Sequence, residues 1–205
     1  MILTAIAVSV LSGCTGYSSS NSARMGDYTV IISDSGSECF VRTYRWNGDP
    51  DNTVIDIPDN YSDNTIVAQL GGFTGTGVPN PFSIEGPDDL VVWNTGDLDK
   101  YDVPVYQDDI VFTLKMGRNI KKIYTNIYSK DAVDPYMHIG VEQDDGSIIF
   151  YRVLINVECS DDNPAFYSKD GKLYSRKDDS LEHLPYPGEE SNNAQETDNE
   201  QENEF

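Results

Sequence analysis

The chain has 205 residues, of which 38% are hydrophobic, and a formal net charge of −21. This length and apolar content support one modest hydrophobic core and argue against a second core domain. Thirty-five acidic residues against fourteen basic ones create a negative field that repels phosphate backbones, so no nucleic-acid partner is expected. Thirteen Tyr, seven Phe and many Val and Ile favour strands, which predicts a mainly β fold.

An apolar run at residues 2–11 is interrupted only by Thr4 and Ser9. It has the length of the hydrophobic region of a signal peptide and is too short to span a bilayer. The run ends in Leu11-Ser12-Gly13-Cys14, which resembles the lipobox of bacterial lipoproteins, where the Cys thiol receives a diacylglyceryl group before cleavage. No Lys or Arg precedes the run, which departs from the usual signal-peptide pattern.

These features predict a signal peptide over residues 1–13 and lipidation at Cys14. The mature protein is then expected to be held by its lipid on the outer face of a membrane of the bacterial cell envelope. Ser, Gly and Asn dominate residues 15–22, a composition that predicts a flexible tether over residues 14–24. The alternative is a buried N-terminal strand that happens to contain Cys14.

The pattern of strands and turns begins after the tether. Residues 28–32 and 39–46 flank a turn-rich run at 33–37, which predicts a β-hairpin. A turn cluster at 47–52 precedes a short strand at 53–58 that a proline ends. Glycines and prolines are so frequent over 71–89 that we expect an ordered loop. Further strands are expected at 90–93, 110–116, part of 120–128, 137–141 and 148–157.

Residues 157–187 contain an Asn163-Pro164 turn, a Tyr-Ser-Lys-Asp-Gly-Lys-Leu-Tyr run over 167–174 and a closing hydrophobic-Pro exit. This stretch resembles a repeat variant of the BspA-like leucine-rich-repeat surface proteins. Residues 53–58 with 66–71, and residues 112–123, look like further turns of that family. The family's Ala-Phe and Cys-x-x-Leu positions are missing, however, and the spacing between turns is uneven.

The resemblance implies a short, degenerate leucine-rich-repeat-like β-solenoid with capping hairpins. Each turn of such a fold is too small to bury its apolar face alone and must stack on its neighbours. The opening hairpin would cap one end, and a tight hairpin turn at Asp170-Gly171 would cap the other. The alternative is an unrelated β-sandwich that uses similar turns.

The composition changes again at the end of the chain. Residues 188–205 hold seven acidic residues and no basic ones, so they bury too little apolar surface to offset their ordering entropy. We therefore expect a disordered acidic tail over 188–205 and a β-rich repeat-like domain over 25–187.

Catalytic and metal-binding motifs are scarce. His138 and His183 lie in different segments and lack the spacing of a zinc site, and no nucleophile elbow, phosphate loop or dinucleotide fingerprint occurs. No metal or cofactor is expected. Carboxylates that could form a glycosidase-like pair are too numerous to single one out, and they include Asp97, Asp99, Asp108, Asp109, Glu142, Asp144 and Asp145. Cys39 and Cys159 are expected to be buried free thiols.

Four cations fall within eight residues around an expected turn, in a chain that is otherwise acidic. The candidate ligand contacts are Lys115, Arg118, Lys121, Lys122, Tyr124 and Tyr128. The cations can dock an anionic glycan or peptide, and the tyrosines can stack on a sugar together with Tyr136 and Tyr151. The alternative is a solvated strand edge that discourages aggregation.

We predict a cell-surface lipoprotein that serves as a binding or structural interaction module for an extracellular protein or glycan and is not an enzyme. The alternative is a small secreted, carboxylate-dependent glycoside hydrolase or polysaccharide-processing accessory. The first function is favoured because no motif defines a nucleophile, a base or a metal.

Overall fold

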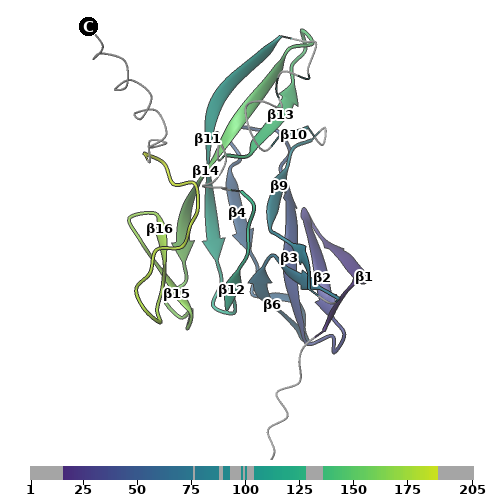
Figure 1. The fold of residues 1–205 in the computed structure, drawn as a ribbon, viewed down its shortest axis with the longest axis vertical. Helices are drawn as coiled ribbons and strands as arrows, with labels where there is room; N and C mark the ends of the chain where they lie inside the picture. The colour runs from purple at the N-terminus through teal and green to yellow at the C-terminus, as the bar shows by residue number, and fades with distance from the viewer. Residues whose placement is uncertain are drawn as a thin grey trace, which may run out of the picture.

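A computed structural model describes residues 16–75, 77–87, 90–92, 98, 100, 104–127 and 136–188 (Figure 1). Within these ranges the chain is mainly β, as predicted, and contains no α-helix. Two larger sheets contribute to one hydrophobic core. No helix of the described part is long and apolar enough to cross a membrane.

The first sheet contains most of the N-terminal strands. Its main path runs β1 (Tyr17–Met25), β2 (Tyr28–Ser33), β3 (Glu38–Arg45), β6 (Thr65–Leu70) and β12 (Lys122–Ile123), with β5 (Asn60–Ser62) beside β6 and β9 (Ser83–Glu85) beside β3. Strands β1 to β3 are antiparallel, whereas β6 and β9 pair with β3, and β12 with β6, in parallel. The β2–β3 hairpin is the predicted opening hairpin.

The prediction of a flexible tether over 14–24 is wrong from residue 17 onward, because Tyr17–Met25 forms strand β1. This strand pairs with the free edge of β2, and Tyr17 packs edge-on against Phe40 with ring centroids 5.1 Å apart. A polar strand needs no core of its own when an existing sheet supplies its hydrogen-bond partners. The domain therefore begins at or before Tyr17 rather than at residue 25. The predicted signal peptide, Cys14 and residues 189–205 lie outside the described residues.

The second sheet has the spatial order β10 (Val91–Val92), β13 (His138–Glu142), β14 (Ile148–Cys159), β11 (Val105–Met116) and β4 (Val54–Ile57). Strands β4, β11 and β14 are parallel, and β13 is antiparallel to β14. Alternate residues of β11 are buried from Ile110 to Met116, as the period of a strand requires. The other ends of β11 and β14 extend with β13 above the body of the molecule (Figure 1).

In both sheets the parallel strands lie side by side in the order in which they occur along the chain. The chain adds β3, β6 and β12 to the first sheet and, alternating with them, β4, β11 and β14 to the second. The strand register places apolar residues beside one another. Leu114 lies between Ile55 and Val157, and all three are buried. Segments far apart in the sequence therefore lie side by side in each sheet.

After β6 the chain leaves the first sheet at Gly71. It forms a short hairpin of β7 (Gly72–Thr74) and β8 (Val78–Asn80) and returns at Phe82, ahead of β9. The Phe82 N–H donates to the Tyr124 carbonyl at 2.8 Å, which fixes the return point. The segment predicted as a loop over 71–89 thus contains the short strands β7, β8 and β9, and two of these strands include Gly72 and Pro79.

The C-terminal hairpin consists of β15 (Phe166–Lys169) and β16 (Lys172–Ser175). Asp170 and Gly171 have φ values of 53° and 75°, which confirms the predicted tight turn. The hairpin covers the outer edge of β14, since the Val157 N–H donates to the Gly171 carbonyl at 2.8 Å. The Asn163 side-chain amide also donates to the carbonyls of Gly117 and Ile120, which fastens the base of the hairpin to the end of β11.

Both cysteines of the described domain are free thiols. Cys39 is fully buried in β3, and burial raises its pKa to about 12. Cys159 is only partly buried at the end of β14, and burial raises its pKa to about 11. The prediction of buried thiols is therefore confirmed for Cys39 and holds in part for Cys159.

Candidate ligand-binding groove

The structure separates the predicted cations into two groups. Lys115 and Arg118 belong to the first group, at the end of β11, where each meets a carboxylate. Lys115 Nζ lies 3.8 Å from Glu158 Oε2, and Arg118 Nε lies 3.2 Å from Asp59 Oδ2. Such exposed pairs neutralise their own charge locally. These two residues therefore do not form part of an open anion site.

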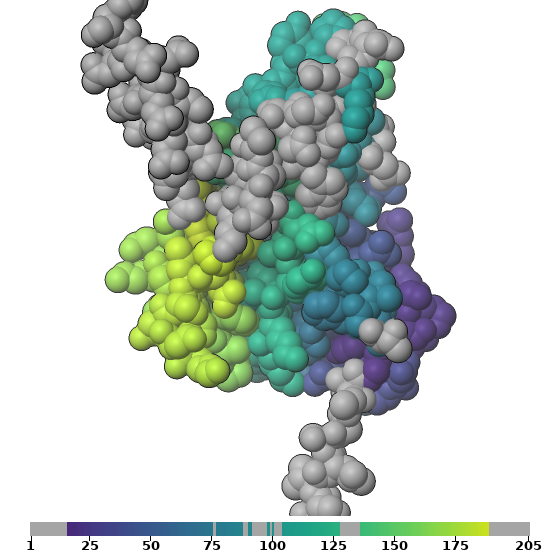
Figure 2. Space-filling view, in the orientation of Figure 1, coloured from purple at the N-terminus to yellow at the C-terminus, as the bar shows by residue number. Residues whose placement is uncertain are grey.

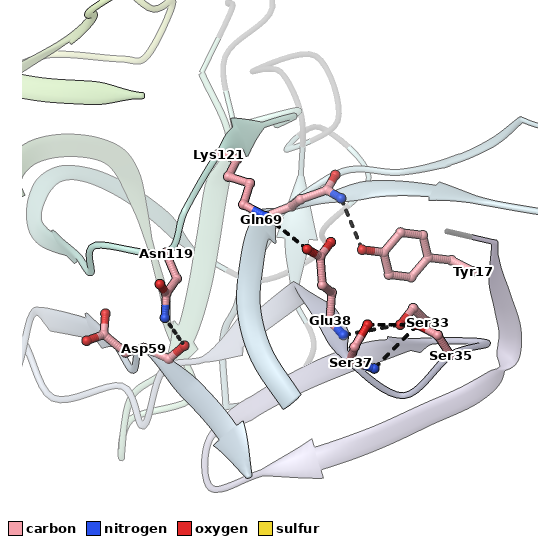
Figure 3. A network of polar contacts seen from close by, with 9 residues as sticks. All are labelled: Tyr17, Ser33, Ser35, Ser37, Glu38, Asp59, Gln69, Asn119 and Lys121. Carbon is pink, nitrogen blue, oxygen red and sulfur yellow. Dashed lines mark hydrogen bonds and ion pairs between the residues drawn. The ribbon is translucent and has the colours of Figure 1, made fainter. Parts of the chain in front are cut away.

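Lys121, Lys122 and Tyr124 form the second group, on and beside β12. Lys121 Nζ donates to Glu38 Oε1 at 2.9 Å, and this ion pair joins the residue before β12 to the start of β3 (Figure 3). Lys122 is exposed, and within the described part of the chain it has no ion-pair partner. The Tyr124 ring contacts the Phe73 ring, with centroids 4.9 Å apart.

These residues border a groove of about 620 Å³ between β12, the β7 segment and the C-terminal hairpin. In Figure 2 the yellow-green C-terminal segment lies directly beside the teal middle part of the chain. The residues that line the groove are Gln69, Gly72, Phe73, Lys121, Lys122, Ile123, Tyr124, Pro164, Ala165, Phe166, Ser175, Arg176, Lys177 and Glu182. The size falls within the range of ligand-binding clefts.

Lys121, Lys122, Ile123 and Tyr124 all line the groove although they are consecutive in an extended segment. Successive side chains of a strand point to opposite faces, so a hollow bordered by four in a row runs along the strand edge rather than over one face. β12 is in fact the last strand of the main path of its sheet. The groove therefore gives access to a sheet edge.

The charge of the groove is opposite to that of the chain. Among the described residues, four cations line it, Lys121, Lys122, Arg176 and Lys177, against the single carboxylate of Glu182. Burial raises the pKa of Glu182, with the neighbouring Asp178 adding to the rise and His183 opposing it, so that this carboxylate resists ionisation. The groove thus favours an anionic ligand.

Arg176 is held rigidly. Its Nε donates to the carbonyls of Asn163 and Phe166 at 2.8 and 2.9 Å, and its guanidinium lies over the Tyr167 ring, 5.5 Å from the centroid. Lys177, by contrast, is exposed and has no ion-pair partner among the described residues. Lys122 and Lys177 are accordingly the cations most available to a ligand.

Sequence reasoning missed Phe73, Arg176, Lys177 and Glu182, which come to the groove from β7 and from the C-terminal hairpin. One signal was present. The chain has two places where basic residues are adjacent, Lys121-Lys122 and Arg176-Lys177, and both line the same groove. In an acidic chain two such pairs are worth testing as one site.

The other candidate residues are placed elsewhere or not described. Tyr136 is buried, and Tyr151 packs edge-on against Trp46 with centroids 5.6 Å apart, so neither joins Tyr124 in an exposed face. Tyr128, Asp97 and Asp99 lie outside the described residues. His138 is buried in β13, and His183 is exposed.

Two of the described carboxylates named as glycosidase candidates, Asp109 and Asp145, are engaged in hydrogen bonds with neighbouring side chains. Asp109 accepts two hydrogen bonds from Arg152, at 2.7 and 2.6 Å. Asp145 accepts hydrogen bonds from the Ser147 hydroxyl and N–H, which lower its pKa, the opposite of what a general acid requires. No group of three or more His, Cys, Asp and Glu residues in the described ranges is arranged to hold a metal ion.

No family model, curated protein or solved structure matches this chain. What the groove does must therefore follow from its own residues.

Proposed function

We propose that this chain is a lipid-anchored protein on the outer face of the bacterial cell envelope that binds an extracellular protein or glycan through the groove beside β12. In this proposal it acts by binding and is not an enzyme. The observation that carries it is an exposed aromatic pair next to unpaired cations in a groove whose charge is opposite to that of the chain.

The aromatic pair supports a binding role on physical grounds. Phe73 is 51% exposed and Tyr124 is 36% exposed, and their rings lie together in the lining of the groove. Leaving two large apolar side chains in water forgoes the free energy that burial would provide. Contiguous exposed aromatic surface rimmed by polar groups is typical of interaction sites.

We further propose that the two sheets are the walls of a short, degenerate β-solenoid of the leucine-rich-repeat type. The parallel strands of both sheets follow one another in the same order, which is what a coiling chain produces. The Ile57-Pro58 exit after β4 and the hairpin after β14 agree with the BspA-like resemblance. The antiparallel strands β1, β2 and β13 are additions to the coil, and a β-sandwich remains the alternative description.

The proposed site predicts that binding depends on Tyr124. The domain that begins at Tyr17 would be used for a glycan array and for pull-down from its native environment, as wild type, Tyr124→Ala and Tyr106→Ala. Tyr106 is the matched control, because it is 59% exposed on β11 and does not line the groove. We expect Tyr124→Ala to lose the glycans or proteins that the wild type and Tyr106→Ala both retain. Retention of all ligands by Tyr124→Ala would contradict the groove as the binding site.

A further inference from the structure

The two sheets end differently on the side of the C-terminal hairpin. In the second sheet β13 pairs with β14 only as far as Arg152, and the edge of β14 beyond that point is covered, because its Ile155 and Val157 N–H groups donate to the carbonyls of Pro185 and Gly171. In the first sheet the corresponding edge strand β12 borders the groove. The next strand position of the first sheet is therefore open, with Ser175–Lys177 on its far wall.

A sheet edge selects a particular kind of ligand. It presents backbone N–H and C=O groups at the spacing of a strand, and an extended peptide satisfies them with its own backbone. A glycan lacks this regular array of donors and acceptors. The open edge beside β12 therefore favours a peptide in extended conformation.

The side chains around the edge specify the chemistry of that peptide. Lys122 and Tyr124 are two residues apart and so lie on the same face of the extended chain. A strand added beside them would place alternate residues opposite Lys122 and the Phe73–Tyr124 pair. Lys177 adds a second cation from the opposite wall.

We infer that the groove receives an extended acidic peptide segment of a partner protein, which adds as a strand to the edge of β12. Its acidic residues face Lys122 and Lys177, and an apolar or aromatic residue two positions away packs on Phe73 and Tyr124. The inference rests on the proposed function and specifies the partner that the groove accepts.

The test uses fluorescein-labelled heptapeptides and fluorescence anisotropy with the full chain. The probe Thr-Glu-Thr-Phe-Thr-Glu-Thr carries its acidic and aromatic residues on one face and reads the same in both directions. Its Gln counterpart should bind about tenfold more weakly, since two exposed charge pairs contribute up to about fivefold each. Raising the salt concentration should weaken the Glu probe and leave the Gln probe nearly unchanged.

Backbone methylation separates strand addition from simple charge attraction. Only alternate N–H groups of an added strand face its neighbour. We expect the probe methylated on one alternating set of nitrogens to lose at least about tenfold in affinity, and the probe methylated on the other set to lose less, because each lost hydrogen bond costs up to about tenfold. Equal effects of the two methylations would overturn the strand.

Variants locate the binding site. The double variant Lys122→Gln with Lys177→Gln should bind the Glu probe about tenfold more weakly and melt like the wild type. Lys169→Gln is the matched control, because Lys169 is exposed at the end of β15 and does not line the groove. Its affinity should be unchanged. Equal loss in the control and the double variant would overturn the assignment.

The remaining outcomes distinguish this inference from the proposed function. If oligogalacturonate binds in a Tyr124-dependent way while the peptides do not, the ligand is a glycan; the inference fails and the proposed function stands. If deletion of residues 189–205 raises the affinity for the Glu probe about tenfold, the chain's own acidic end competes for the groove. That result would overturn the assignment of the groove to a peptide of a partner protein. Unchanged affinity on that deletion supports the inference.

Discussion

Gly71 is the residue at which the chain leaves the first sheet, and the backbone there has no room for a side chain. Its φ is +66°, and a Cβ would clash with the Tyr124 carbonyl oxygen and lie 2.5 Å from the Phe82 nitrogen. Both contacts are with backbone, which cannot rotate away. We expect Gly71→Ala to lower the free energy of unfolding by more than the roughly 1 kcal/mol of a left-handed alanine, on the order of 3 kcal/mol.

Gly26 provides the matched control for that substitution. Its φ is +59°, but nothing lies within 4 Å of the position that a Cβ would take. Gly26→Ala should therefore cost only the conformational strain, about 1 kcal/mol. Urea unfolding of the two variants measures the difference. Equal midpoints would show that the close approach at Gly71 carries no energy of its own.

The raised pKa of Glu182 predicts that the free energy of unfolding depends on pH. Because burial raises its pKa in the folded protein, its ionisation opposes folding. The penalty is absent below about pH 4, where the unfolded chain also binds the proton, and is complete above the raised folded pKa. Glu182→Gln should accordingly raise the thermal midpoint at pH 7 and leave it unchanged near pH 3.5. The exposed Glu142→Gln serves as the control, and an equal rise in that variant would attribute the effect to net charge alone.

Only some residues of the candidate groove could be predicted from the sequence. Lys121, Lys122 and Tyr124 were accessible to sequence reasoning because they are close together in the chain. Phe73 was not, because it reaches the groove through the β7–β8 excursion, and Lys177 carried only the signal of its adjacent basic pair, since the C-terminal hairpin brings it to the groove. Lys115 was misleading, since its partner Glu158 lies on a parallel strand more than forty residues away.

At the level of elements, the strands with alternating apolar residues were predicted and the others were not. The buried part of β11 shows the alternation, whereas its first half, from Val105 to Asp109, is largely exposed and is held as a strand by pairing with β14. β1 was missed for the same reason, because it forms on the edge of β2. Tertiary pairing decided both cases, and no local pattern could reveal it.

The C-terminal hairpin is the element whose removal should expose the core. Gly171 has a φ of +75°, and a Cβ there would lie 2.7 Å from Asn156 Oδ1 on the strand that the hairpin covers. We expect Gly171→Val to cost on the order of 1 to 3 kcal/mol and to loosen the cover of β14. Binding of a hydrophobic dye should then rise below the melting temperature.

Gly146→Val is the control that distinguishes loss of the hairpin's cover over β14 from the backbone strain that valine causes in any tight turn. Gly146 has a φ of +80° in the turn between β13 and β14, with nothing within 4 Å of an added Cβ. It should lower the melting temperature without early dye binding. If Gly171→Val melts like the wild type and binds no extra dye, the hairpin does not act as a cap.

For the whole molecule, the start of β1 determines how the proposed lipid anchor would present the domain. Only Thr15 and Gly16 separate Cys14 from Tyr17, a reach of about 10 Å. The Gly16 carbonyl accepts a hydrogen bond from the Asp34 N–H at 2.8 Å, so the chain enters the domain beside the β2–β3 turn. The turn between β13 and β14 lies at the opposite end (Figure 1). A chain lipidated at Cys14 would therefore hold the β2–β3 turn against the membrane.

Two measurements test the anchor and this orientation together. Radiolabelled palmitate should enter the wild type and be absent from Cys14→Ser, because the Cys14 thiol is the atom that would receive the diacylglyceryl group carrying the fatty acids, and equal labelling would rule the anchor out. In the lipidated protein, a fluorophore on Ser35→Cys should be quenched by a headgroup-bound quencher, and one on Asp144→Cys should not. The raised pKa values of Cys39 and Cys159 lower the thiolate fraction of these residues at neutral pH, so they should react more slowly with the dye than an exposed cysteine. Equal quenching at both positions would mean that the domain lies flat or swings freely, which would overturn this orientation.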